Sequence, residues 1–91
     1  MTSNITLTEH TLAELTLDLA GLGYTATNGH VWFAEAVDTT GELAARVVVD
    51  AAGGVQVLRF SGDTAVVWSA SLSDNAPVTA ILAVAAAALD N

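Results

Sequence analysis

The sequence contains no cysteine and no lysine, and it has one proline and five aromatic residues among 91. Without cysteine the chain can form no disulfide, no thiolate zinc site and no catalytic thiol. Arg46 and Arg59 are the only permanently cationic side chains, so there is no basic patch to bind nucleic-acid phosphates or an anionic membrane. The longest apolar run covers residues 80–89, about half the length of a membrane-spanning helix.

The residues that are present indicate one folded domain spanning 1–91. Apolar residues make up 53% of the chain and charged residues 13%, a balance opposite to that of disordered proteins. The net charge of −8 comes from ten scattered acids and the lack of bases, and it favours protein partners over nucleic acids or membranes. Abundant Ala, Val, Gly, Thr and Asp suggest a GC-rich genome, such as that of an actinobacterium or its phage. The N-terminus has no secretory signal pattern, so we expect a cytoplasmic protein.

Two segments have helical patterns. In the first, predicted over 7–20, leucines recur at helical spacing after a capping box that begins at Thr6, with Thr8 as an alternative cap. Gly21 and Gly23 predict its end. The second helix is predicted over 75–89, with Asp74 or Asn75 as its cap and Pro77 in its first turn. This helix is apolar on all sides, so we expect it to be buried against the sheet or a second subunit.

Between the helices the apolar pattern has a period of two. Strands are predicted over 24–27, 30–37, 43–50, 55–60 and 64–72, separated by short turns that force antiparallel pairing. Asn28-Gly29 is the strongest of the turn signals. The predicted fold class is α+β: a two-layer sandwich of an N-terminal helix, an antiparallel meander of four or five strands, and a C-terminal helix, with both helices on one sheet face.

The register of the central hairpin decides what its two faces carry. A turn centred between Ala52 and Gly53 places Arg46 opposite Arg59 and turns both arginines away from the helices. This register predicts a core face of Leu43, Ala45, Val47, Val49, Gln56, Leu58, Phe60, Val66, Trp68 and Leu72. It predicts an outer face whose candidate partner-binding or dimerisation residues are Arg46, Val48, Val57, Arg59 and Val67.

Two registers remain open for 30–37. One puts Trp32 on the outer face, and the other puts Val31, Phe33, Glu35 and Val37 there, with Glu35 diagonal to Arg46. Two facing arginines repel each other, so their charge requires compensation, either by Asp50 or Glu35 with solvent, or by the carboxylates of a partner.

No motif for catalysis or metal binding stands out. His10, Glu14 and Asp18 share a helix face, a pattern typical of solvated surfaces, and His30 has no histidine nearby to complete a metal site. The Gly53-Gly54 pair precedes a strand, whereas a phosphate loop precedes a helix. We therefore expect no catalytic residues, metal or cofactor.

These observations favour a non-enzymatic protein-interaction or regulatory accessory module that binds another protein or forms a homodimer, through either the outer sheet face or the alanine-rich helix. A small-molecule binder or small enzyme, with a pocket between helices and sheet, is the alternative hypothesis. An acidic mimic of nucleic acid is a third, and it requires acids in rows along one face.

Overall fold

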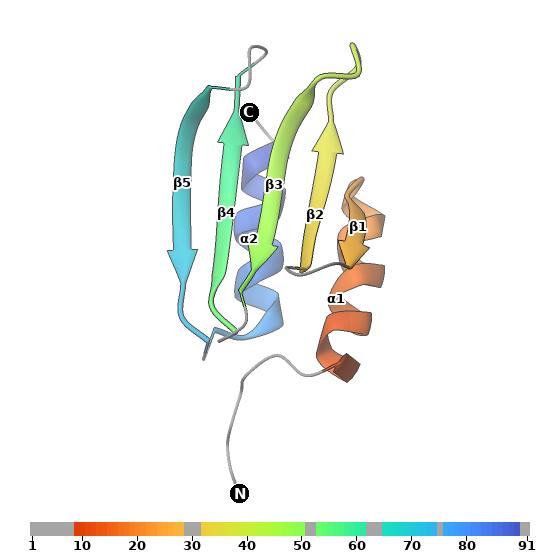
Figure 1. Ribbon diagram of the computed structural model, residues 1–91, viewed down its shortest axis with the longest axis vertical. Coiled ribbons are helices and arrows are strands. Elements are labelled where there is room, and N and C mark those ends of the chain that lie inside the picture. Colours follow the sequence, from red (N-terminus) through yellow and green to blue (C-terminus); the bar gives the residue numbers. More distant parts are fainter. Residues whose placement is uncertain (1–8, 29–31, 51–52, 62–64, 75, 90–91) are drawn as a thin grey trace, which may run out of the picture.

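The computed structural model describes residues 9–28, 32–50, 53–61, 65–74 and 76–89 (Figure 1). Two helices flank five strands in chain order: α1 (Glu9–Leu22), β1 (Thr25–Asn28), β2 (Trp32–Val37), β3 (Leu43–Val49), β4 (Val55–Phe60), β5 (Val66–Leu72) and α2 (Val78–Leu89). The strands form one antiparallel sheet in the order β1-β2-β3-β4-β5.

Both helices lie behind the sheet in Figure 1, which confirms the predicted two-layer α+β arrangement. Helix α1 packs against β1 and α2, and α2 packs against β3 and β4. Within the described part of the chain, neither helix is long and apolar enough to cross a membrane.

Helix α1 ends as its glycines predict, although two residues later than expected. Gly23 has a φ of 109°, the Gly23 N–H donates to the Ala20 carbonyl at 3.1 Å, and the Tyr24 N–H donates to the Leu19 carbonyl at 3.0 Å. This pair of bonds is a Schellman motif, which satisfies carbonyls that the end of a helix would otherwise leave free. The predicted caps Thr6 and Thr8 lie outside the described residues.

Helix α2 is apolar on all sides, yet only one side of it is buried. Ile81, Ala85 and Ala88 are buried against the sheet, whereas Ala83 and Ala87 are exposed. The helix begins after Pro77, whose carbonyl accepts from the backbone N–H groups of Ala80 and Ile81. Of its two predicted caps, Asn75 lies outside the described residues.

The core lies between the helices and one face of the sheet. Its fully buried side chains with the largest volumes are Leu15, Leu19, Ile81, Val47 and Val57. Trp32, Ala34 and Ala36 of β2 also point inward, which settles the open choice for this strand: Phe33 and Glu35 lie on the outer face. Val31 lies outside the described residues.

The predicted register of β3 and β4 is wrong by one residue. Val47 lies opposite Val57, and Arg46 lies opposite Leu58 instead of Arg59. The reason is the turn, in which the Asp50 N–H donates to the Gly54 carbonyl at 3.0 Å and Gly53 adopts a φ of 93°. Residues 50 and 54 therefore pair across residues 51–53, whereas the predicted register paired residue 50 with residue 55, and this difference shifts the pairing by one position.

This shift exchanges the two faces of β4. Val55, Val57 and Arg59 face the helices, whereas Gln56, Leu58 and Phe60 lie on the outer face. This finding corrects two predictions. Gln56, Leu58 and Phe60 were predicted to point inward, and Val57 and Arg59 were predicted to point outward.

The faces of β5 are close to the prediction. Trp68 and Leu72 pack against the core, and Ser69 and Ser71 are exposed on the outer face. Val66 was expected in the core, but a register shift between Arg59 and Phe60 places it opposite Phe60, with 52% of its surface exposed.

Candidate protein-interaction face

The structure divides the five predicted interaction residues between the two sheet faces. Arg46, Val48 and Val67 lie on the outer face, where Val67 is 60% exposed. Val57 is fully buried under the helices, and the Arg59 side chain reaches α2. The five therefore do not form one continuous surface.

Arg59 stabilises the end of α2. Its Nη1 donates to the Ala88 carbonyl at 2.6 Å, and the Tyr24 hydroxyl donates to the Ala85 carbonyl one turn earlier at 2.8 Å. A cation near a helix C-terminus also interacts favourably with the helix dipole. Arg59 thus belongs to the fold and is not a free cation for a partner.

Tyr24 has an altered acidity in this setting. Burial raises the pKa of its hydroxyl to about 12, an effect that the nearby positive charge of Arg59 partly offsets. The hydroxyl therefore remains protonated at neutral pH, where it acts as a hydrogen-bond donor.

Arg46 is held on the outer face by three neighbours. Its Nε donates to Glu35 Oε2 at 2.7 Å, and its guanidinium carbon lies 5.9 Å from the ring centre of Phe33 and 5.4 Å from that of Phe60. Glu35 lies directly opposite Arg46, not diagonal to it. Both charged side chains are about one-third exposed, at 37% for Arg46 and 34% for Glu35. Glu35 therefore balances the charge of Arg46, but the predicted repulsion between two facing arginines does not arise, because Arg59 lies on the other face.

An apolar and aromatic strip surrounds this ion pair. We call it the Phe33–Phe60 strip, and it crosses the three central strands with the side chains of Phe33, Arg46, Val48, Leu58 and Phe60. A shallow hollow of about 250 Å³ opens along it between Phe33, Arg46 and Val48. Leu58 and Phe60 were absent from the predicted outer face, because the turn was expected to be centred between Ala52 and Gly53, with residue 50 opposite residue 55. The glycine at position 53 was the signal that allowed the three-residue alternative.

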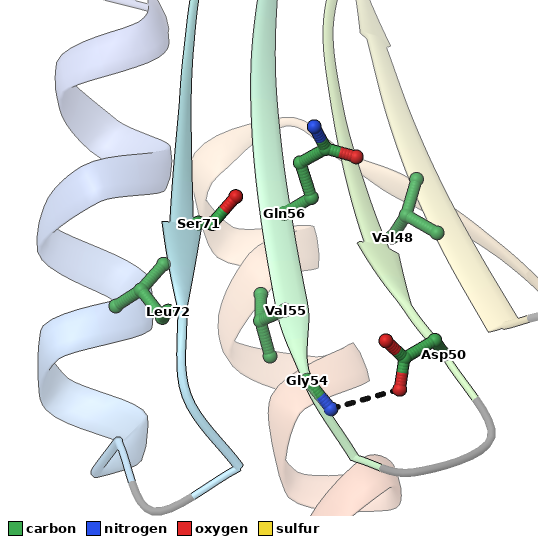
Figure 2. A pocket seen from close by; sticks show the side chains of 7 residues that line it. All are labelled: Val48, Asp50, Gly54, Val55, Gln56, Ser71 and Leu72. Atoms are coloured by element: carbon green, nitrogen blue, oxygen red, sulfur yellow. Dashed lines mark hydrogen bonds between the residues drawn. The ribbon is translucent and has the colours of Figure 1, made fainter.

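A second hollow lies where β3, β4 and β5 end near the β3–β4 turn. It measures about 240 Å³ and contains three polar side chains, Asp50, Gln56 and Ser71 (Figure 2). Asp50 Oδ1 already accepts from the Gly54 N–H at 2.9 Å, so it helps to close the turn. The hollow is open at the surface and does not lie enclosed between helices and sheet.

A third hollow, about 490 Å³, lies on the exposed side of α2. Its lining consists of apolar residues: Leu22, Ala83, Ala86, Ala87 and Leu89. This surface is the alanine-rich face that sequence analysis proposed as an alternative dimer contact.

Apart from Glu35 on the outer sheet face and Asp50 at the β3–β4 turn, the acids whose side chains are described lie on α1 and in the loops. Glu14 and Asp18 are exposed on α1, Asp38 and Glu42 lie in the β2–β3 loop, and Asp74 follows β5. In that loop, hydrogen bonds from the Thr40 side chain and from backbone N–H groups lower the pKa of Asp38. Among the described residues, no three His, Asp or Glu side chains gather as metal ligands. The side chain of His10 and all of His30 lie outside the described residues.

Comparison with known proteins does not assign the chain to a family. No family model matches the chain, and no curated protein or solved structure is significantly similar to it.

Proposed function

We propose that this chain is a non-enzymatic protein-interaction module and that the Phe33–Phe60 strip contacts an apolar surface of a partner protein. The observation that supports the proposal most directly is the position of the strip. It lies on the sheet face opposite both helices, at the centre of the sheet, where no described element covers it.

The chemistry of the strip suits protein recognition. Aromatic residues and arginine are enriched at the centres of protein interfaces, and in this strip two phenylalanines flank one arginine, with Phe33 partly exposed and Phe60 8% exposed. Because Glu35 already pairs with Arg46, the strip requires no acidic partner. A largely uncharged, apolar surface fits it best.

Matched variants test this proposal. Leu58→Glu places a charge within the strip, while Leu17→Glu places the same charge on α1, where Leu17 is 74% exposed. Each variant and the wild-type chain are immobilised and exposed to an extract of the cells that encode the protein, and the bound proteins are quantified by mass spectrometry.

We expect at least one protein to be bound equally by the wild-type chain and Leu17→Glu, and to be reduced about tenfold or more by Leu58→Glu. Circular dichroism confirms that each variant is folded. Equal recovery of the same proteins by all three chains would refute the role of the strip.

Small-molecule binding is a second candidate, supported only by the three polar side chains around the hollow at the β3–β4 turn. A fragment that binds there would shift the amide resonances of Gln56 and Ser71 in a saturable way. If no fragment produces such shifts in an NMR screen, this candidate is excluded at that site.

A further inference from the structure

The two edges of the sheet differ in how they are protected. At one edge, β1 has four residues and packs against α1. At the other edge, β5 has seven residues, and no described element lies beyond it. Figure 1 shows α2 behind the neighbouring strands β3 and β4, with β5 beside the helix layer.

From Trp68 to Leu72, strand β5 also lacks the features that prevent an edge strand from pairing, since its one bulge lies at its start. Natural edge strands are protected by charged residues, proline, short length or coverage, because their free N–H and C=O groups can accept another strand. The sequence of β5 is Val-Val-Trp-Ser-Ala-Ser-Leu, which contains no charge and no proline. The only irregularity in its pairing with β4 occurs at its first residues.

From this edge we propose that two copies of the chain pair through β5, antiparallel, so that their sheets join into one continuous sheet. The proposal goes beyond the interaction strip and does not depend on it. It would also place the outer faces of both copies side by side on the same surface.

The edge strand itself carries no charge that would repel a second copy. Each molecule has a net charge of −8, so two copies can approach closely only through surfaces that are free of acids. The acids described on α1 and in the β2–β3 loop lie away from β5, Asp50 lines the hollow that Ser71 and Leu72 of β5 also line, and Asp74 lies beyond the end of β5. Among the described residues, β5 itself therefore brings no acid into the contact.

The flanking side chains add apolar contact area to this pairing. Trp68, Ala70 and Leu72 point toward the helix layer but are only partly buried, because α2 packs on β3 and β4. In a symmetric pair, the copies of these three residues meet across the dyad. A strand edge by itself provides too little area for a stable dimer, and these residues increase it.

The symmetry limits the possible registers. Paired residues of two strands in one sheet share a face. A twofold axis between two β5 strands must therefore pass midway between one residue and its own copy in the other chain. The residue on the axis lies directly opposite its own copy, with Cβ atoms about 4.5–5.5 Å apart. The shortest of these separations meets the upper end of the range of about 3.5–4.5 Å found in disulfide bonds, and the natural chain has no cysteine to interfere.

Single-cysteine variants test the pairing directly. Val67→Cys, Ser69→Cys, Ala70→Cys and Ser71→Cys sample the edge, and Leu17→Cys on α1 is the control. Under mild oxidation we expect covalent dimers to form with a maximum at one edge position and a decline on either side of it. Cross-linking no greater than that of Leu17→Cys at all four positions would overturn the proposal.

A second experiment measures the mass of the chain in solution. Light scattering at micromolar concentrations should give twice the chain mass for the wild-type protein and for the double variant Thr25→Lys with Thr27→Lys at the opposite edge. The double variant Ser69→Lys with Ser71→Lys should dissociate about tenfold more readily, because like charges meet across the pair. All four positions are exposed, so these changes leave the monomer folded.

The outcomes separate this pairing from the proposed function. Leu58→Glu should leave the dimer intact, since Leu58 lies on β4, away from the edge. A monomeric wild-type chain, or a dimer that Leu58→Glu disrupts and the β5 lysines do not, would contradict pairing through β5. Neither result would by itself remove the strip as a surface for another protein.

Discussion

At the residue scale, the two arginines show how one cation stabilises a fold while the other shapes a surface. Arg59 binds the Ala88 carbonyl at the end of α2, whereas Arg46 lies between two aromatic rings beside Glu35. The side chains point to opposite faces because the β3–β4 turn has three residues. A substitution of Arg59 therefore perturbs helix packing, while a substitution of Arg46 alters the outer face.

Tyr24 provides a test of the core at high pH. The pKa of its hydroxyl is raised from 10.0 to about 12 in the folded chain, so the folded state favours the protonated form. This contribution to stability is fully present below pH 10 and is lost as the pH rises from 10 toward 12. Its size is on the order of 2–3 kcal/mol.

The measurement is the free energy of unfolding by urea as a function of pH, for the wild-type chain and for Tyr24→Phe. The variant should lose about 1 kcal/mol at neutral pH, since the bond to Ala85 is absent, and most of the decline between pH 10 and 12 should disappear. The absence of lysine and cysteine removes the other side chains that usually titrate near pH 10. If the free energy of unfolding declined equally in both chains between pH 10 and 12, ionisation of Tyr24 would not be the cause of the decline.

At the scale of elements, the end of α1 shows that two nearby glycines have opposite roles. Gly21 is helical and Gly23 has a φ of 109°, and an added Cβ would meet no atom within 4 Å at either position. The difference between them is therefore conformational and not steric.

We expect Gly21→Ala to stabilise the chain by about 0.5–1 kcal/mol, because alanine favours the helix. Gly23→Ala should destabilise it by about 1 kcal/mol, because alanine is strained in the left-handed region. Thermal unfolding of both variants, monitored by circular dichroism, measures the two effects. Changes of the same sign would contradict the described end of α1.

At the scale of the whole molecule, the helices cover one face of the sheet and leave the other open. A matched pair of substitutions tests this assignment in the central strands. Val57 is fully buried under the helices, and Val48 is partly exposed on the outer face.

Val57→Glu places an unpaired carboxylate in the core and should cost more than about 3 kcal/mol, enough to unfold much of the protein. Val48→Glu should cost less than about 1 kcal/mol, because its carboxylate remains in water. The free energy of unfolding of each variant, measured with urea, distinguishes these two outcomes. A similar loss for both would mean that the outer face is also covered, and it would weaken the proposed interaction strip.

The same two positions show how far sequence reasoning reached. The bounds of β4 were predicted without error and the faces of β3 were right from Ala45 to Val49, because alternating apolar residues define a strand and its buried side. The faces of β4 were exchanged, because a turn that differs by one residue reverses every side chain that follows it. As a result, three of the predicted site residues, Arg46, Val48 and Val67, lie on the outer face. The other two, Val57 and Arg59, lie on the helix side of the sheet.

The sequence by itself determined the order of the elements, the antiparallel meander and the helix-covered core, because these follow from local periodicity and short connections. Only the tertiary structure decided which β4 residues meet β3, which arginine reaches α2, and which edge remains open. These features depend on hydrogen bonds between Asp50 and Gly54 and on where α2 lies across the sheet. Contacts between distant residues cannot be obtained from a pattern that repeats every two or four positions.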